Sequence, residues 1–221
     1  MISNIFFDLD GTLADPRESI LRSFQFALER LGRPRIADSR ILEFIGPPLR
    51  LSFEKILSTA DKTVIEKAVS LFRKRFSRKG IAEYDIYPGI AELLSDLYRK
   101  SYNLRVVTAK PKIYADKIVQ QLGLDQWIGD VFGPALDGRF DDKSELVAHI
   151  IHNLDLMPNE IAMVGDRRED IMAGKSNGIF TIAVTYGFGS QKEIEDSAPD
   201  YICHHPSEIQ ATLAQPDIII R

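Results

Sequence analysis

The chain has 221 residues, of which 44% are hydrophobic and 27% charged, and its formal net charge is −4. These values are typical of a globular protein of one or two domains, and no apolar stretch approaches the roughly 20 residues that span a bilayer. The single cysteine, Cys203, excludes an intramolecular disulfide and, with no basic leader before an apolar block, predicts a cytoplasmic protein without a membrane partner.

The most informative segment is the beginning of the chain, where the apolar run Asn4–Phe7 leads into Asp8, Leu9 and Asp10. The run predicts a buried parallel strand, and Gly11 permits an abrupt turn after it. Two carboxylates are then expected at the carboxyl end of a central strand, where open α/β sheets bind their ligands. Because close, buried carboxylates repel each other, a divalent cation is needed to compensate their charge, and oxygen ligands favour Mg²⁺.

Residues 16–80 have apolar positions at helical spacing and contain no convincing strand. They predict an all-helical domain inserted after the first strand, with helices over 16–31, 38–45, 49–57 and 62–78. Between Arg17 and Lys79, basic side chains are about twice as numerous as acidic ones, which could draw in an anionic substrate. We expect no nucleic-acid partner, because the basic residues are spread along helices with few aromatic residues between them.

The rest of the chain alternates short apolar runs with helical segments, which is the pattern of an α/β sheet. The expected strands are 104–107, 131–132, 161–164, 181–184 and an edge strand at 201–202. The expected helices are 89–100, 111–122, 143–154, 170–176 and 206–213. The fold class is therefore α/β, with a Rossmann-like, mainly parallel sheet flanked by helices. We expect residues 1–15 and 87–221 to form this core and residues 16–86 to form the inserted domain. The sequence does not indicate where the apolar end, Ile218–Arg221, packs.

Polar and charged side chains follow two more of the expected strands. Thr108 closes one of them. A threonine after a strand is more often simply a cap, but its hydroxyl and the N–H groups that follow, ahead of a helix N-terminus, can also form a phosphate pocket. Asp166 follows another strand, and Asp170 lies one helical turn later. Lys143 begins a helix after a polar loop. With the two N-terminal acids, these residues are candidates for the charged groups that phosphoryl transfer requires, although a lysine taken alone is usually a surface charge.

Four segments, in order, resemble the motifs of the haloacid dehalogenase superfamily, chiefly phosphatases that act through an aspartyl-phosphate. They are Asp8–Leu13 (Asp-Leu-Asp-Gly-Thr-Leu), Thr108, Lys143 and Gly165–Asp170 (Gly-Asp-Arg-Arg-Glu-Asp). The resemblance covers essentially the whole chain. Two segments are similar to the phosphoglycolate phosphatase branch, which has a helical cap. Thr108–Pro111 resembles Thr-Asn-Lys-Pro, with Ala109 in place of the asparagine. Phe44–Leu49 resembles a cap segment that also occurs in relatives assigned as 5′-nucleotidases.

The resemblance implies a role for each of these residues. Asp8 is the nucleophile. Asp10 binds the metal through its backbone carbonyl, while its side chain protonates the leaving oxygen and later activates water. Thr108 and Lys143 complete the catalytic set, with Lys143 neutralising both nucleophile and phosphate. The implied metal ligands are Asp8, Asp10, Asp166 and Asp170. The residues expected at the phosphate or the remainder of the substrate are Gly11, Thr12, Thr108, Ala109, Lys110, Lys143 and, in the inserted domain, Arg50.

We therefore expect a Mg²⁺-dependent phosphomonoester hydrolase, similar to phosphoglycolate phosphatase, that acts on a small phosphorylated metabolite as a monomer or homodimer. A 5′-nucleotidase or pyrophosphatase of the same fold is the alternative. Phosphoglycolate, a nucleoside 5′-monophosphate, pyrophosphate and a sugar phosphate are all left open as substrates, because specificity depends on side chains of the inserted domain. We rank Arg139 below Lys143 as the cation, assign the histidines no role, and interpret Gly187-Phe188-Gly189 as a structural turn.

Other functions on this fold or with this chemistry fit the sequence less well. Asp10 argues against a haloacid dehalogenase, and the segment after the first strand lacks the histidine of the β-phosphoglucomutases. Nothing marks Lys55 or Lys62 as the Schiff-base lysine of a phosphonatase. A phospho-aspartate signalling module would be shorter and would have no helical insert. A non-catalytic relative is expected to have lost at least one of the four motifs.

Overall fold

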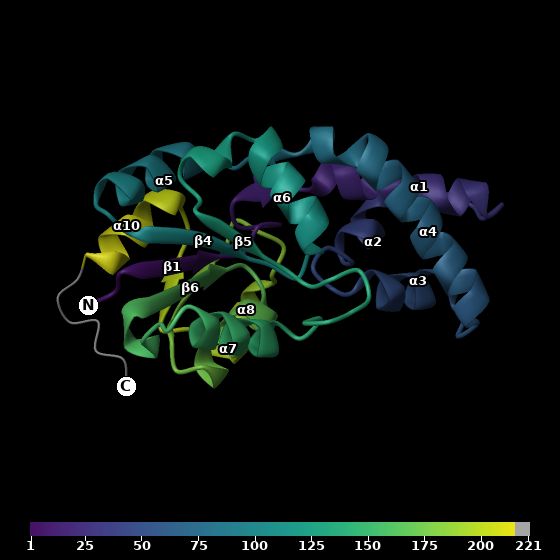
Figure 1. The fold of residues 1–221 in the computed structure, drawn as a ribbon. Helices are drawn as coiled ribbons and strands as arrows, with labels where there is room; N and C mark the ends of the chain where they lie inside the picture. Colours follow the sequence, from purple (N-terminus) through teal and green to yellow (C-terminus); the bar gives the residue numbers. More distant parts are fainter. Residues whose placement is uncertain (215–221) are drawn as a thin grey trace. The chain divides into compact units, whose positions relative to one another are not determined.

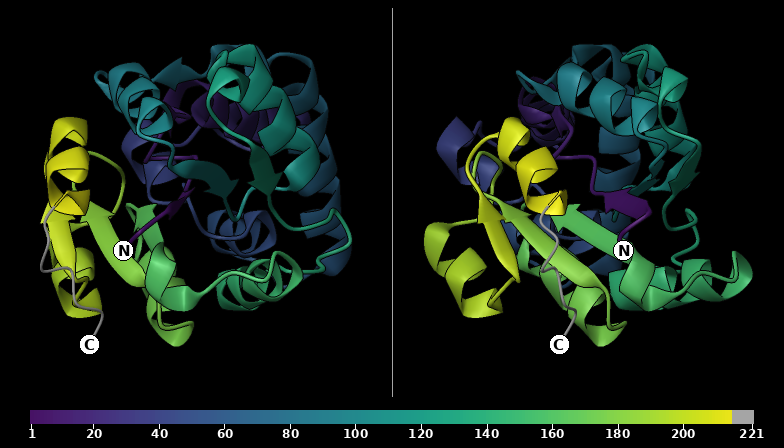
Figure 2. Two further views of the ribbon diagram at one scale, coloured as in Figure 1. Left: turned by 60° about the vertical axis from the view of Figure 1, so that its left-hand side comes forward. Right: turned by 90° about the vertical axis from the view of Figure 1, so that its left-hand side faces the viewer.

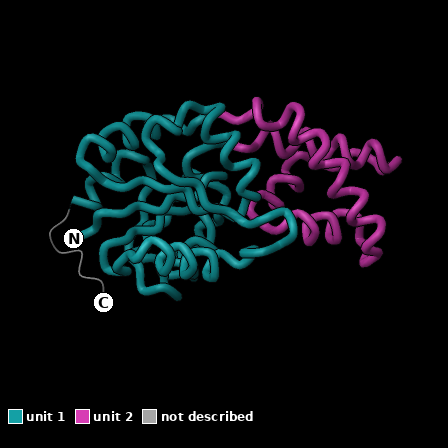
Figure 3. Tube along the Cα trace, in the orientation of Figure 1, with its two compact units in different colours: residues 1–15, 86–221 teal, residues 16–85 magenta. Residues whose placement is uncertain are grey.

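The computed structural model describes residues 1–214, so the apolar end Ile218–Arg221 lies outside the described residues. The chain forms two compact units, which Figure 3 distinguishes by colour. The first unit consists of Met1–Asp15 and the chain from Ile86 onward, and the second is Pro16–Asp85. The chain segments that join the units, β2 (Ala14–Asp15) and β3 (Asp85–Ile86), pair in a two-stranded sheet.

The first unit is built on a parallel sheet, which within residues 1–214 has six strands in the order β5-β4-β1-β6-β7-β8 (Figure 1). The central strand β1 pairs with β4 on one side and with β6 on the other, and Phe7 lies opposite Val106 and Val164. The α/β fold predicted from the sequence is confirmed. The strands of this sheet are β1 (Asn4–Phe7), β4 (Asn103–Val107), β5 (Asp130–Phe132), β6 (Ile161–Gly165), β7 (Phe180–Val184) and β8 (Tyr201–Cys203).

Helices cover both faces of the sheet. In Figure 1, α5, α6 and α10 lie on one face and α7 and α8 on the other. Figure 2 shows the last elements, β8 and α10 in yellow, at one edge of the sheet. The helices of this unit are α5 (Ile90–Arg99), α6 (Lys112–Gln121), α7 (Lys143–Asn153), α8 (Arg168–Ser176), α9 (Gln191–Ser197) and α10 (Pro206–Leu213), with short 3-10 helices at Leu124–Gln126 and Pro158–Glu160. Among the described helices, none is long and apolar enough to cross a bilayer.

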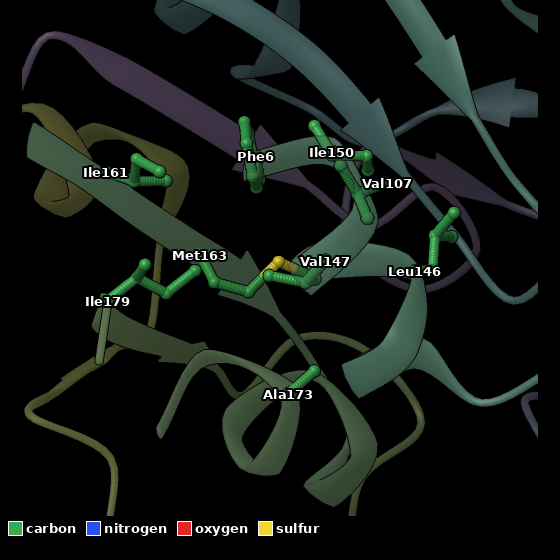
Figure 4. Packing of buried hydrophobic residues seen from close by; sticks show 9 residues of the cluster. All are labelled: Phe6, Val107, Leu146, Val147, Ile150, Ile161, Met163, Ala173 and Ile179. Carbon is green, nitrogen blue, oxygen red and sulfur yellow. The ribbon is translucent and has the colours of Figure 1, made fainter. Parts of the chain in front are cut away.

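The core of this unit explains why β1, β4 and β6 lie together. Their apolar residues point into a cluster closed by α7 and α8, which Figure 4 shows from close by. Phe6 and Met163, from the paired strands β1 and β6, are fully buried in it. Each such side chain contributes about 1.5–3 kcal/mol when removed from water. The cluster consists of Phe6, Val107, Leu146, Val147, Ile150, Ile161, Met163, Ala173 and Ile179.

The second unit is helical. Its helices are α1 (Arg17–Arg30), α2 (Asp38–Leu42), α3 (Leu49–Leu57) and α4 (Lys62–Arg78), followed by the 3-10 helix Gly80–Glu83. Its core is aromatic, because Phe24 of α1 packs against Phe53 and Phe72 with ring centroids 4.9 Å and 5.0 Å away. The Asp61 side chain caps α4 by accepting from the backbone N–H groups of Thr63 and Val64.

The short strands β2 and β3 were not predicted, and three of the helices differ most from the sequence prediction. Helix α2 ends at Leu42 rather than at residue 45, because Gly46 adopts a positive φ of 106° and two prolines follow. Helix α8 begins at Arg168, two residues earlier than predicted, because the Asp170 carboxylate caps it by accepting from the Arg167 N–H. Helix α9 was not predicted, since its seven polar-rich residues bury only Ile194 and Ser197 and give no apolar periodicity.

Candidate active site

Three parallel strands bring the predicted site residues to one edge of the sheet. Asp8 follows β1, Thr108 follows β4 and Asp166 follows β6, and these strands are direct neighbours. The Asp8 N–H donates to the Val164 carbonyl at 2.9 Å, so the backbone pairing of β1 with β6 extends to the first acid. All three side chains are buried, with exposed fractions of 6%, 2% and 0%. The fold thus removes these polar groups from water and places them together.

The centre of the site is a cluster of three buried carboxylates. Asp8, Asp166 and Asp170 each offer an oxygen atom, and these atoms lie within 4.8 Å of one another. The Lys143 ammonium, at the start of α7, donates to Oδ1 of Asp8 at 2.8 Å and also bonds to Oδ1 of Asp170. One ammonium against three carboxylates leaves the cluster with an excess of negative charge in a setting where charge is costly.

The protonation equilibria of the cluster reflect this excess. Burial raises the pKa of Asp166 well above its ordinary value, and the neighbouring carboxylates of Asp170 and Asp8 raise it further. Burial also raises the pKa of Asp170 to about 6, although the Lys143 charge opposes that rise. For Lys143, burial favours a lower pKa, but the Asp170 and Asp8 charges prevail and raise it. The Lys143 ammonium therefore stays charged, whereas the carboxylates of Asp166 and Asp170 bind a proton more readily than exposed carboxylates do.

The donor set fits a hard divalent cation. It offers carboxylate oxygens only. Within residues 1–214, Asp8, Asp166 and Asp170 form the one group of three or more potential metal ligands whose ligand atoms lie close together. A dication at that point would neutralise the excess charge that Lys143 leaves uncompensated, and carboxylate oxygens are the preferred ligands of Mg²⁺ and Ca²⁺. No histidine belongs to this group of described residues.

Asp166 is held in place by a turn on each side. The Thr12 hydroxyl donates to its Oδ1 at 3.3 Å, and the Phe188 N–H donates to its Oδ2 at 2.7 Å. Glycines allow both backbones to approach this closely. A Cβ atom at Gly11 or Gly187 would overlap with the Asp166 carboxylate, and Gly11 adopts a φ of +88° that disfavours other residues.

The segment after β7 is the part of the site that the sequence did not reveal. Gly187-Phe188-Gly189 was interpreted as a structural turn, but it contacts Asp166 directly. A Cβ at Gly189 would overlap with the backbone oxygen of Asp166. The available signal was the position of these glycines just after a strand, which the strand order places beside β6.

Asp10 and Lys110 form a second charged pair beside the cluster. Nζ of Lys110 lies 2.6 Å from Oδ2 of Asp10, and both side chains are mostly buried. The backbone N–H of Lys110 donates to Oγ1 of Thr108 at 3.3 Å, so the turn after β4 is folded over its own threonine. Ala109, between them, is exposed. These contacts connect Asp10 to the predicted phosphate pocket.

The remaining predicted residues have other surroundings. The N–H groups of Gly11 and Thr12 donate to the carbonyls of Ala14 and Leu9 within the turn after β1. Arg50 belongs to the helical unit, where its guanidinium pairs with Glu66 of α4. Arg139 is exposed and pairs with Asp137. The phosphate-binding and substrate-binding roles of these residues remain predictions.

Comparison with known proteins identifies the family. A family model for haloacid dehalogenase-like hydrolases matches residues 5–184. A 5′-nucleotidase from Pseudomonas aeruginosa is 40% identical over 200 residues, which cover 90% of each chain. The tyrosine-protein kinase PtkA of Mycobacterium tuberculosis is 30% identical, over 90% of this chain and 68% of that protein. Phosphoglycolate phosphatases and a pyrophosphatase are further relatives, at 26% to 30% identity.

Solved structures agree with this result. A haloacid dehalogenase-like family hydrolase from Streptococcus pneumoniae superimposes with a TM-score of 0.88 at 32% identity, covering 96% of this chain and 98% of that one. This chain belongs to the haloacid dehalogenase-like hydrolase family. Within that family it is an enzyme of the phosphatase kind, and the sequence-based predictions of family, fold and enzyme class are confirmed.

Proposed function

We propose that this protein is a Mg²⁺-dependent phosphomonoester hydrolase that acts through an aspartyl-phosphate on a small phosphorylated metabolite. The observation that carries the proposal is the buried meeting point of Asp8, Asp166 and Asp170 beside the Lys143 ammonium. Such a site has the negative ligands for a dication and a separate fixed cation for phosphate oxygens. Phosphoryl transfer is catalysed mainly by charge placement of this kind.

In the proposed reaction Asp8 is the nucleophile. One of its carboxylate oxygens attacks phosphorus, the bond from phosphorus to the ester oxygen breaks, and the leaving oxygen takes a proton from Asp10. A water molecule then attacks the phosphorus of the aspartyl-phosphate and gives a proton back to Asp10, which releases phosphate and restores Asp8. Lys143 fixes the Asp8 carboxylate through the 2.8 Å hydrogen bond to Oδ1 and offers positive charge to the transferring group.

The metal site would consist of the side chains of Asp8, Asp166 and Asp170 and the backbone carbonyl of Asp10. When bound, Mg²⁺ supplies positive charge that offsets the negative charge of the phosphate and the attacking carboxylate. We place Thr108, Ala109 and Lys110 at the phosphate, with Lys110 also holding Asp10 through their 2.6 Å ion pair. We also place Gly11 and Thr12 at the phosphate. Their contacts support a second role, which is to fix the position of the Asp166 carboxylate.

We propose that the helical unit, Pro16–Asp85, is a cap that selects the substrate and excludes water from the site. Arg50, in the segment that resembles the phosphoglycolate phosphatase cap, is the proposed specificity residue. A nucleoside 5′-monophosphate is the second candidate substrate beside phosphoglycolate, and the 40% identity to a 5′-nucleotidase favours it. Pyrophosphate and sugar phosphates stay as further candidates. We also propose a cytoplasmic protein that works as a monomer or homodimer.

The test is phosphate release from p-nitrophenyl phosphate by the purified protein, with Mg²⁺ and with excess chelator. We expect turnover that requires Mg²⁺ and that Asp8→Asn abolishes. Asp196→Asn is the matched control, because Asp196 is exposed on α9 and pairs there with Lys192, away from the proposed catalytic residues. Undiminished activity of Asp8→Asn would refute the nucleophile. Phosphate transferred from ATP to a protein tyrosine, with none released to solution, would refute the hydrolase and favour a kinase like PtkA.

A further inference from the structure

The segment after β7 carries a tyrosine that the proposed reaction does not use. We propose that Tyr186 is a positioning residue that fixes the metal-binding carboxylate of Asp166 through Thr12. This inference rests on the proposed Mg²⁺ site and adds a residue that acts on it without touching metal or substrate. It is built from three contacts of Tyr186 and Phe188, with Thr12, Asp166 and Tyr87.

The first contact is a hydrogen bond between two separate turns. The Tyr186 hydroxyl donates to the backbone carbonyl of Thr12 at 3.1 Å, across 174 positions of sequence. The side chain of that same threonine is fully buried and donates to Oδ1 of Asp166 at 3.3 Å. The tyrosine therefore holds the residue whose hydroxyl orients one oxygen of the carboxylate.

The second contact comes from the same segment. Two residues after Tyr186, the Phe188 N–H donates to the other carboxylate oxygen, Oδ2 of Asp166, at 2.7 Å. Between them, Gly187 has no side chain, and a Cβ there would overlap with both the Asp166 carboxylate and the Gly11 carbonyl oxygen. One short segment thus orients both oxygens of Asp166, one directly and one through Thr12.

The third contact holds the tyrosine ring. Tyr186 packs against Tyr87, with ring centroids 5.2 Å apart and planes inclined by 59°. The Tyr87 N–H donates to the carbonyl of Leu13, the residue after Thr12, at 3.2 Å. Burial, followed by the nearby Asp166 charge, raises the pKa of Tyr186, so its hydroxyl remains a neutral donor. The Tyr186 hydroxyl thus contacts Thr12, and its ring packs against Tyr87, whose backbone contacts Leu13.

The physical consequence concerns metal affinity. A ligand carboxylate that is held in its binding geometry loses less rotamer freedom when the ion arrives, and groups that orient ligands typically change metal affinity by about 10–100-fold. Tyr186 acts on Asp166 through one more hydrogen bond than Thr12 does. The loss of metal affinity on removing its hydroxyl should therefore lie at the lower end of that range. The chemistry at phosphorus should change little once the metal is bound.

The experiment compares Tyr186→Phe with the wild type and with Tyr98→Phe, a matched control on the exposed part of α5. Mg²⁺ binding to the protein without substrate is measured by isothermal titration calorimetry, and the thermal midpoint is measured with chelator and with Mg²⁺. We expect Tyr186→Phe to bind Mg²⁺ about tenfold more weakly, Tyr98→Phe to equal the wild type, and the midpoints with chelator to agree. In kinetics, the Mg²⁺ concentration for half-maximal rate should rise while kcat at saturating Mg²⁺ stays within about threefold.

A second pair of variants tests the route through Thr12. Thr12→Val, which lacks the hydroxyl, should weaken Mg²⁺ binding at least as much as Tyr186→Phe, and Thr12→Ser should restore it. Equal Mg²⁺ affinity of Tyr186→Phe and wild type overturns this inference and leaves the proposed hydrolase intact. The same holds if the variant loses kcat at saturating Mg²⁺ with unchanged affinity. A wild-type protein that binds no Mg²⁺ overturns both the inference and the proposed function.

Discussion

The Lys143 ammonium donates to Oδ1 of Asp8 at 2.8 Å, although 135 positions separate the two residues in the sequence. The same ammonium bonds to Asp170. One cation at the start of α7 therefore pairs with two acids, one that follows β1 and one in the first turn of α8. All three side chains are buried. This arrangement couples stability to chemistry, because the cation that we expect to face the phosphate also permits two acids to remain buried.

Replacing Lys143 by methionine should therefore affect both properties. The substitution keeps an unbranched side chain but leaves Asp8 and Asp170 buried without their cation. Breaking a buried ion pair in this way typically costs about 3–5 kcal/mol of unfolding free energy. Loss of a fixed charge at the transferring group should lower kcat by about 10²–10³-fold. Urea unfolding at neutral pH and phosphatase assays check the two expectations.

Lys192→Met is the control for that substitution. Lys192 lies on α9, with a side chain that is 84% exposed and paired with Asp196 one turn away. Exposed pairs of this kind contribute about 0–1 kcal/mol, so stability and activity should stay close to wild type. A Lys143→Met protein with wild-type stability would contradict the idea that this ammonium is what keeps the acids buried.

In the metal-free protein, the contribution of Asp170 to stability should fall as pH rises. The pKa of Asp170 is raised from 3.8 to about 6 by burial, so the folded protein binds this proton more tightly than the unfolded chain. Its favourable contribution is complete below pH 4 and is lost as pH rises through 6, which lowers the unfolding free energy by about 3 kcal/mol. Asp166, whose pKa is also raised, acts in the same direction.

Urea unfolding with chelator at pH 4, 5, 6 and 7 measures this slope. Asp170→Asn should flatten it, because the substituted amide does not titrate. Added Mg²⁺ should increase the unfolding free energy more at pH 7 than at pH 4, because the ion requires deprotonated carboxylates and binds more strongly as pH rises. If the stability of the metal-free wild type relative to Asp170→Asn did not fall from pH 4 to pH 7, the burial argument would be contradicted, because this difference isolates Asp170 from carboxyls such as Glu83 and Glu193, whose pKa values are lowered.

How much of the site could be predicted depended on the kind of contact. Asp8 and Asp10 could be placed at a strand end, because Ile5, Phe6 and Phe7 make the strand apolar on both faces and such runs lie at the centre of parallel sheets. The contact between Lys143 and Asp8 could not be derived from spacing and came from the resemblance to a family. Loop conformation decides such contacts, and no periodicity encodes it.

The segment around Gly187 was missed for a related reason. Its strand, β7, was predicted, but the order of strands in the sheet was not, and only that order brings residues 186–189 beside Asp166. The start of α8 was placed two residues late because Asp170 is at once a helix cap and a partner of Lys143. The sequence pattern does not predict either contact of Asp170, because contacts between loops depend on the folded structure.

Gly187→Ala tests the close approach of this segment to Asp166. The added methyl group would overlap with the Asp166 carboxylate, so the acid must move from its place beside Asp8. We expect a loss of about 10–100-fold in Mg²⁺ affinity, and an overpacking cost of about 1–3 kcal/mol in unfolding free energy. Calorimetric Mg²⁺ titration and urea unfolding are the measurements.

The matched control for that substitution is Gly129→Ala. The closest atom to a Cβ at position 129 is the Leu104 carbonyl oxygen, at 3.8 Å, which is ordinary contact. This variant should bind Mg²⁺ like the wild type. If Gly187→Ala also bound Mg²⁺ normally, the carboxylate of Asp166 would not be the ligand that the site requires.

Arg50→Ala tests the proposed specificity of the helical unit. Its guanidinium, held by Glu66, is expected to contact the part of the substrate beyond the phosphate. Loss of a charged hydrogen bond should raise KM for phosphoglycolate or a nucleoside 5′-monophosphate by about tenfold or more and leave p-nitrophenyl phosphate largely unaffected. Lys74→Ala, on the exposed face of α4, is the control. Equal effects on all substrates would argue against a specificity role.

Asp10→Asn separates the proposed acid from the proposed nucleophile. An alkyl phosphate must have its leaving oxygen protonated as the bond to phosphorus breaks, whereas p-nitrophenolate is a stable anion and leaves without a proton. Because kcat/KM reports the step that forms the aspartyl-phosphate, Asp10→Asn should lower it by about 10²–10⁴-fold for the alkyl ester. The loss for p-nitrophenyl phosphate should be at least tenfold smaller. Asp8→Asn should abolish both reactions alike, since both need the nucleophile.

The ion pair of Asp10 with Lys110 keeps the Asp10 carboxyl beside the proposed phosphate pocket, which is the placement that an acid for the leaving oxygen requires. Equal losses for the two esters in Asp10→Asn would assign the proton to another donor.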